Sequence, residues 1–96
     1  MSHQVTLSWV ATPDAGATGF QGYNIYRGTA AGAESTTPLN ASPVNALTYQ
    51  DTSPVLGEDF YVVKSVVNGV IGTASNEVST AVLPAPPTNL TVVSSN

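Results

Sequence analysis

The chain has 96 residues, a length that fits a single domain. Only 8% of its residues are charged, against about 25% in an ordinary soluble domain, and six acidic residues against two basic ones leave a net charge of −4. Two cations cannot form a phosphate-binding patch, so we expect no nucleic-acid partner. No apolar run is long enough to cross a bilayer, so we expect no membrane insertion. There is no cysteine, so we expect no thiolate-bound metal or cofactor.

The first half of the chain predicts short β-strands separated by turn residues. The expected strands cover residues 5–10, 23–28, 35–40 and 47–51. In the first strand Val5, Leu7 and Trp9 alternate with outward-facing residues, so their side chains should face a core, with Trp9 burying the largest area. The third strand is expected to be the weakest, because Pro38 cannot donate a hydrogen bond to a ladder.

The most apolar strand is expected over residues 60–67. Tyr61 lies on one face of this strand, and Phe60 and Lys64 lie on the other face. An unpaired buried ammonium group is costly, so the face that carries Lys64 should look outward. Asn68-Gly69 then predicts a type I′ hairpin turn, in which both central residues need positive φ, and a return strand over residues 70–82.

The last part of the chain is divided from the rest by prolines at positions 84, 86 and 87, which predict a stiff linker. A final β-rich segment follows over residues 88–93, in which Thr88, Leu90 and Val92 share one face. We therefore divide the chain into a sandwich over residues 1–83 and a linker with a strand-like segment over residues 84–96.

The order of these motifs resembles that of a fibronectin type III domain. Val5-Thr-Leu-Ser-Trp9 resembles strand B of that family and Gly22-Tyr-Asn-Ile-Tyr-Arg27 resembles strand C. Tyr49-Gln-Asp51, Tyr61-Val-Val-Lys-Ser-Val66 and Ser75-Asn-Glu-Val78 resemble strands E, F and G. The resemblance implies an all-β, immunoglobulin-like antiparallel β-sandwich of about seven strands. In its low content of charged residues the chain resembles bacterial members of this family, which accompany secreted hydrolases and surface proteins.

The chain departs from the family pattern before strand F. Many members have a tyrosine there that bonds back to the preceding corner, whereas this chain has Asp59. Two alternatives follow: Asp59 accepts backbone N–H bonds, or Tyr61 takes the place of the missing tyrosine.

The second departure concerns strand A, which has no counterpart before residue 5. Residues 85–93 resemble strand A instead, so the chain resembles either a shifted cut from a tandem array or a circular permutant. In this family strand G ends at the pole opposite the start of strand A. The five residues 83–87 reach only about 16 Å, less than the roughly 24 Å of a seven-residue strand. This length favours donation of residues 88–93 to a neighbouring copy, with Thr88, Leu90 and Val92 as the donor residues. The alternative is that the segment serves its own sandwich, as it would in a permuted chain.

Candidate chemical sites are few. His3 has no neighbouring residue to orient it for catalysis. Glu58 and Asp59 are interpreted as solvated turn carboxylates, because no acidic loop with calcium-ligand spacing accompanies them. Tyr26 and Phe60 are expected on outward faces of neighbouring strands. There they are either isolated exposed aromatic residues, which are common, or a binding surface for carbohydrate or protein.

These observations predict a non-catalytic structural or connector module of an extracellular or cell-surface multidomain protein. Its expected partners are neighbouring modules or further copies of itself, and no cofactor, metal or catalytic residue is expected. The alternative is a carbohydrate- or protein-binding module that uses the exposed aromatic residues and the loops after Trp9 and at Asn68-Gly69. No signal peptide is expected in this fragment, because its first residues have no basic and apolar regions.

Overall fold

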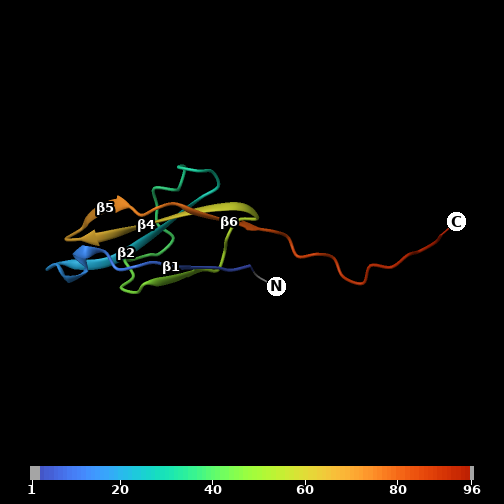
Figure 1. Cartoon of the computed structure of the whole chain (residues 1–96), viewed down its shortest axis with the longest axis horizontal. Coiled ribbons are helices and arrows are strands. Elements are labelled where there is room, and N and C mark those ends of the chain that lie inside the picture. The colour runs from blue at the N-terminus through green and yellow to red at the C-terminus, as the bar shows by residue number, and fades with distance from the viewer. Residues whose placement is uncertain (1–2, 96) are drawn as a thin grey trace.

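Two antiparallel sheets face each other in the computed structural model, which describes residues 3–95 (Figure 1). Met1, Ser2 and Asn96, which belong to the predicted ranges 1–83 and 84–96, lie outside the described residues. The smaller sheet pairs β1 (Val5–Ser8) with β3 (Thr48–Asp51). The larger sheet contains β2 (Phe20–Gly28), β4 (Gly57–Val67), β5 (Val70–Ala74) and β6 (Val78–Val82). The predicted all-β antiparallel sandwich is confirmed.

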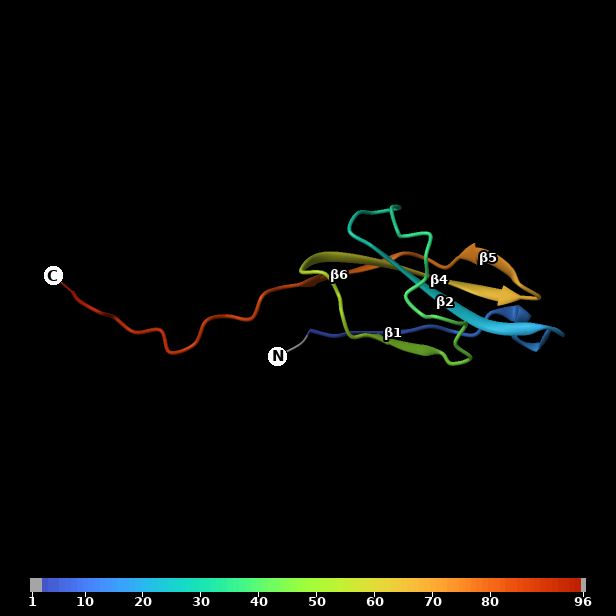
Figure 2. The same ribbon diagram turned by 180° about the vertical axis from the view of Figure 1, so that it is seen from behind.

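The eleven-residue β4 is the centre of the larger sheet. It pairs with β2 along one edge, and on its other edge β6 pairs with its first half and β5 with its second half. The one helical turn among the described residues is the 3-10 segment Pro13–Gly16, which Thr12 caps through its side-chain oxygen. Figure 2 shows the same two layers from behind, with β1 and β3 on one side and β2, β4, β5 and β6 on the other.

The predicted hairpin turn is confirmed, because Asn68 and Gly69 have φ values of 52° and 74°. The return strand, in contrast, is not continuous over residues 70–82. Ser75 interrupts it: its Oγ accepts the N–H of Val63 (3.0 Å), and its own N–H donates to the carbonyl of Val63 (2.8 Å). A side chain thus replaces a backbone partner at this point, and the strand is divided into β5 and β6.

The strand predicted over residues 35–40 is wrong, because this segment has no regular ladder. It still follows the free edge of β2: Leu39 donates its N–H to the carbonyl of Ile25 (2.7 Å), and the side chain of Asn40 accepts the N–H of Ile25 (2.9 Å). A side-chain oxygen supplies the acceptor that a backbone carbonyl would supply in a strand. Pro38 has no N–H to extend the pairing.

The core contains Tyr23, Ile25 and Tyr61, as the alternation predicts for the two tyrosines. Trp9 points to the same interior but is only half-buried, as are Val5 and Leu7. The predicted inward orientation of these three side chains is therefore confirmed, but they are not fully buried. The reason is that nothing among the described residues covers the outer edge of β1.

The carboxylate of Asp51, which is only 4% exposed, connects the two sheets. Asp51 ends β3, and its Oδ2 accepts hydrogen bonds from Arg27 of β2 and from the Tyr61 hydroxyl of β4, both at 2.7 Å. Its Oδ1 accepts the N–H of Ser53 at 3.1 Å. Burial works against ionisation of Asp51, but these hydrogen bonds outweigh it and hold the pKa of the carboxyl below its ordinary value. Burial and the bond to Asp51 raise the pKa of the Tyr61 hydroxyl.

Asp59 is fully buried, so its interpretation as a solvated turn carboxylate is wrong. The residue shares the inward face of β4 with Tyr61, and its Oδ1 accepts the N–H of Val55 (3.2 Å). Both alternatives for the corner before this strand therefore occur: Asp59 accepts a backbone N–H, and the Tyr61 hydroxyl bonds back to residue 51.

We expect Asp51→Asn to lower the free energy of unfolding by roughly 2–4 kcal/mol, because the substitution leaves Arg27 without its ionic partner in a mostly buried site. Urea unfolding at pH 7 measures this change. Asp14→Asn, at an exposed position of the 3-10 turn, is the matched control and should change stability little. Equal stability of the two variants would contradict the role of Asp51.

The contribution of Asp51 should depend on pH with a defined sign. Because its pKa in the folded protein is lower than the ordinary value of about 3.9, its ionised form adds stability above that value, and this contribution is lost as the pH falls through the folded pKa. The stability difference between the unaltered chain and Asp51→Asn should therefore narrow from pH 7 toward pH 3 in parallel urea titrations. A difference that widens on acidification would reverse the assigned sign.

Candidate functional site

The outer edge of β1 has no paired strand among residues 3–95. Trp9 donates its N–H to the carbonyl of Leu47 (3.0 Å), so the backbone groups of every second residue, at positions 5, 7 and 9, point toward β3. By the same alternation, the N–H and C=O groups of Thr6 and Ser8 point away from β3. Proteins usually protect such an edge with lysine, proline or a covering segment, and this edge has neither residue type.

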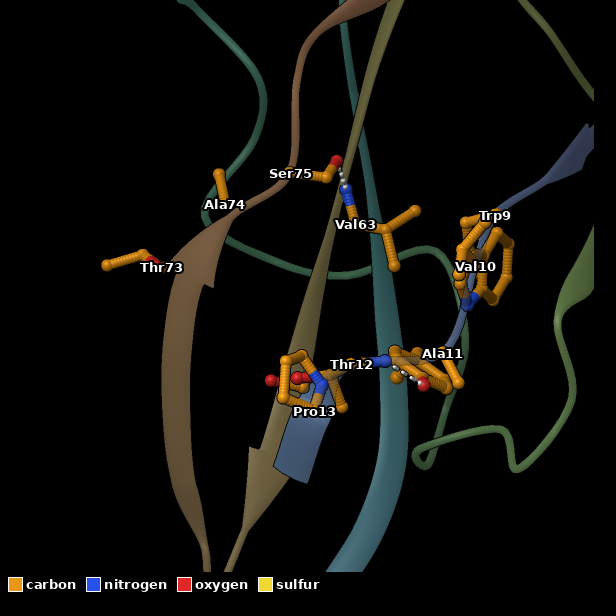
Figure 3. Close-up of a pocket in the computed structure, with 11 residues that line it drawn as sticks. Trp9, Val10, Ala11, Thr12, Pro13, Val63, Thr73, Ala74 and Ser75 are labelled. Carbon is orange, nitrogen blue, oxygen red and sulfur yellow. Dashed lines mark hydrogen bonds between the residues drawn. The ribbon is translucent and has the colours of Figure 1, made fainter. Parts of the chain in front are cut away.

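A groove runs along this edge between the two sheets. Three hollows of about 260, 360 and 360 Å³ adjoin along this edge, since neighbouring ones share lining residues, and together we call them the acceptor groove. Residues 4–13 form one wall, and residues 61–65 of β4 with residues 73–80 form the other. Figure 3 shows the hollow of about 260 Å³, where Trp9 and Val10 lie across from Val63 and Ser75. No residue that lines the groove is charged.

The direction of β1 follows from its neighbours across the groove. Residues 4–7 face residues 78–80 of β6, near the end of the module where the chain leaves the sheet. Residues 9–13 face residues 73–75, nearer the Asn68-Gly69 hairpin. β1 therefore runs opposite to β6, from the tail end of the module toward the hairpin end.

Trp9 marks an incomplete part of the groove wall. Its ring contacts Tyr23 edge to face, with 5.4 Å between the ring centroids. Its indole Nε1 is shielded from solvent and has no hydrogen-bond partner among the described residues. A buried donor without an acceptor costs about 1–3 kcal/mol, so an acceptor placed in the groove beside Trp9 would be stabilising.

The segment after β6 leaves the sandwich and extends away from it, so that the longest dimension of the structure is 74 Å (Figure 1). Residues 83–95, which we call the tail, form no strand, and no residue of the tail is charged. The predicted donor residues are solvent-exposed here: Leu90 is 95% and Val92 is 83% exposed, and Thr88 is also exposed. The tail bends at Asn89, where φ is 57°.

The predicted aromatic surface is not formed as expected. Tyr26 is only 2% exposed, so its expected position on an open outward face is wrong. The ammonium group of Lys64 lies 4.7 Å from the centroid of its ring, and its hydroxyl accepts a hydrogen bond from the side chain of Asn24 (3.2 Å). Phe60 is half-buried. The alternation placed these side chains on the outer face correctly but did not reveal that their neighbours cover them.

The two loops that a carbohydrate- or protein-binding module was expected to use, the loop after Trp9 and the Asn68-Gly69 turn, are hydrogen-bonded to each other at the hairpin end. Asn68 donates its N–H to the carbonyl of Gly19 (2.9 Å), and Gly69 donates to the side chain of Gln21 (2.5 Å). Gly19 has a φ of 88°, and a Cβ atom at this position would collide with the side chain of Asn68. The hairpin and the loop before β2 therefore form one unit.

Other site classes find little support in the described residues. No group of three or more histidine, cysteine, aspartate or glutamate side chains in residues 3–95 is arranged to hold a metal ion. No helix within this range has the length and apolar character needed to cross a membrane.

Comparison with known proteins finds similarity to solved structures but not to a family model or a curated protein. No family model matches the chain, and no curated protein matches it. Among solved structures, the chain is similar to the crystal structure of an Fn3-like protein from Clostridium thermocellum, with 30% sequence identity and a TM-score of 0.64. The match covers 88% of this chain and 80% of that chain.

We expect Tyr26→Ala to lower the free energy of unfolding by roughly 3–5 kcal/mol, because it removes a buried aromatic ring. Phe60→Ala should cost less, since its side chain is only half-buried. Urea unfolding followed by circular dichroism measures both. A Tyr26→Ala variant as stable as the unaltered chain would show that this ring is not part of the packed structure.

Proposed function

This chain belongs to the fibronectin type III-like family, and from that premise we propose that it is a non-catalytic structural module that connects head to tail with its neighbours by strand donation. The proposal includes an extracellular or cell-surface location in a multidomain protein. The location is supported by the resemblance to bacterial members that accompany secreted proteins and by the bacterial source of the similar Fn3-like structure.

One observation carries the proposal: an unpaired strand edge and an unpaired strand-like segment occur in the same chain. The acceptor groove is uncharged and lined by apolar side chains such as Leu7 and Val78. The tail is also uncharged and exposes Leu90 and Val92 on one face. Adding a strand to an open edge supplies backbone hydrogen bonds and a place for every second side chain, which is the pairing these two features need.

The position of the groove supports donation of the tail to a neighbour, because it opposes antiparallel pairing of the tail with β1 of its own module. Val82 pairs with Gly57 at the tail end, whereas Trp9 lies level with Val63, six residues further along β4. Six strand steps span about 20 Å, and the six steps from Val82 to Thr88 reach no more than about 20 Å when fully extended, which leaves no length for the chain to reverse. The linker is therefore too short to place residue 88 beside Trp9 of its own module, as antiparallel pairing with its own β1 would require.

A concentration series of the full-length chain by light scattering tests the proposal. The average mass should rise above the 9.8 kDa of the single chain as the concentration increases. Leu90→Asp should weaken this association at least roughly tenfold, because it removes about 1.5–3 kcal/mol of apolar burial and places a charge in an uncharged groove.

Thr91→Asp is the matched control. It adds the same charge one residue away, on the face of the tail that would look outward, and should associate like the unaltered chain. A folded full-length chain that stays monomeric at every concentration would refute strand donation, and equal weakening by both substitutions would refute the assigned face.

The alternative carbohydrate- or protein-binding function has no specific observation in its favour. Tyr26 is covered, and the hairpin loop is fastened to the loop before β2. A binding function would therefore need a surface other than the predicted aromatic pair.

A further inference from the structure

We infer, on the basis of the proposed function, that the donated tail lies antiparallel to β1 of the next copy, with Leu90 beside Leu7 and Val92 beside Val5. Identical copies then repeat by translation and form an open, polar chain of modules. The inference fixes the partner as a second copy of this chain and fixes the direction and register of the added strand.

The direction follows from how the elements run. β6 leads into the tail, and β1 runs opposite to β6. In Figures 1 and 2 the tail continues away from the sandwich at the end where β6 finishes. If the next copy has the same orientation, a tail that enters its groove runs opposite to that copy's β1. Translation alone therefore produces an antiparallel pair, and a head-to-tail contact of this kind need not close into a ring.

A tail that served its own module would differ in a measurable way. The linker cannot reach the hairpin end first, so the tail would have to reverse after Val82 and run parallel to its own β1. The direction of the added strand thus separates donation to a neighbour from closure onto the same module.

The register follows from the alternation of both strands. Val5, Leu7 and Trp9 face the interior, and partners on an antiparallel pair share a face, so they must stand beside the even-numbered tail residues. Placing Leu90 beside Leu7 aligns residues 88–93 with residues 9–4, the stretch of β1 whose pairing is already formed on the other side. Pro87 then lies opposite Val10, where its missing N–H ends the ladder.

The same register gives Trp9 its missing partner. Thr88 falls beside Trp9 on the interior face, where its hydroxyl oxygen is placed to accept a hydrogen bond from the indole Nε1 that is buried and unpaired in the single chain. The two apolar tail residues meet apolar residues of β1, and the one polar residue meets the one unpaired donor. Asn89 straightens from its φ of 57° to an extended conformation on pairing.

The repeat distance is set by the same geometry. The offset along the module between Val82 and Trp9 is about 20 Å, and the six residues from Val82 to Thr88 span about 20 Å more. Successive copies should therefore repeat roughly every 40 Å along the axis.

Cysteine pairing between full-length chains tests the inference, since the chain has no cysteine of its own. Single substitutions at the exposed positions Thr6, Ser8, Asn89 and Thr91 are mixed in pairs under a mild oxidant. The antiparallel register brings position 6 beside 91 and position 8 beside 89, at a Cα separation of about 5.5 Å that a disulfide can bridge. These two mixtures should give about tenfold more mixed dimer than the mixtures of 6 with 89 and 8 with 91.

Each other outcome has a defined meaning. Efficient dimers from both 6 with 89 and 8 with 91 would show a parallel strand and overturn the inference while leaving strand donation intact. No mixed dimer from any pair in a solution that assembles by light scattering would overturn it as well. A monomeric solution in which the double variant Thr6→Cys/Thr91→Cys closes within one chain would refute both the inference and the proposed function.

A permuted chain provides the second variant. When residues 84–96 are placed before residue 1, the tail reaches the groove of its own module antiparallel to β1, so the protein should stay monomeric at concentrations where the natural order assembles. The single tryptophan lies in the groove wall, and its emission should shift to shorter wavelength, as in the assembled natural chain. Leu90→Asp in the permuted chain should abolish that shift, and a permuted chain without any shift would overturn the antiparallel register.

Discussion

The carboxylate of Asp51 holds the two sheets of this module together. The sheets share no backbone ladder among the described residues, and a two-stranded sheet such as β1 with β3 has little stability by itself. Asp51 sits at the end of β3 and bonds to Arg27 of β2 and Tyr61 of β4, two neighbouring strands of the other sheet. It thereby positions β1 over the core with one edge paired and the other edge facing the groove.

The parts of the fold that depend on local chemistry were predictable. Alternation located the strands around Trp9, Tyr23 and Tyr61, and the Asn68-Gly69 turn followed from the need for two positive φ values. Alternation cannot predict which neighbouring side chains cover each face of a strand. Tyr26 lies on the outer face as the pattern requires, yet the side chain of Lys64 shields it, and a strand period says nothing about that neighbour.

The features that sequence reasoning missed are side-chain contacts between distant segments. Arg27 and Asp51 are 24 residues apart in the sequence, and the identity of either residue does not indicate which residue it pairs with. Ser75 divides the return strand by bonding to Val63 through its side chain, which a propensity for strand does not reveal. The strand-like character of the tail was visible in its alternation, whereas the groove became visible only when residues 4–13 and 61–80 were brought together.

The fastening of the hairpin to the loop before β2 limits how this end of the module can vary. Immunoglobulin-type domains that recognise diverse ligands need loops that accept insertions and new side chains independently of one another. Here a side chain at position 19 would collide with the side chain of Asn68, and most residues at position 68 would strain the positive-φ turn that directs its backbone N–H to the carbonyl of Gly19. Sequence drift in one loop therefore requires a matching change in the other, so this end of the module is suited to conservation of shape rather than to diversification.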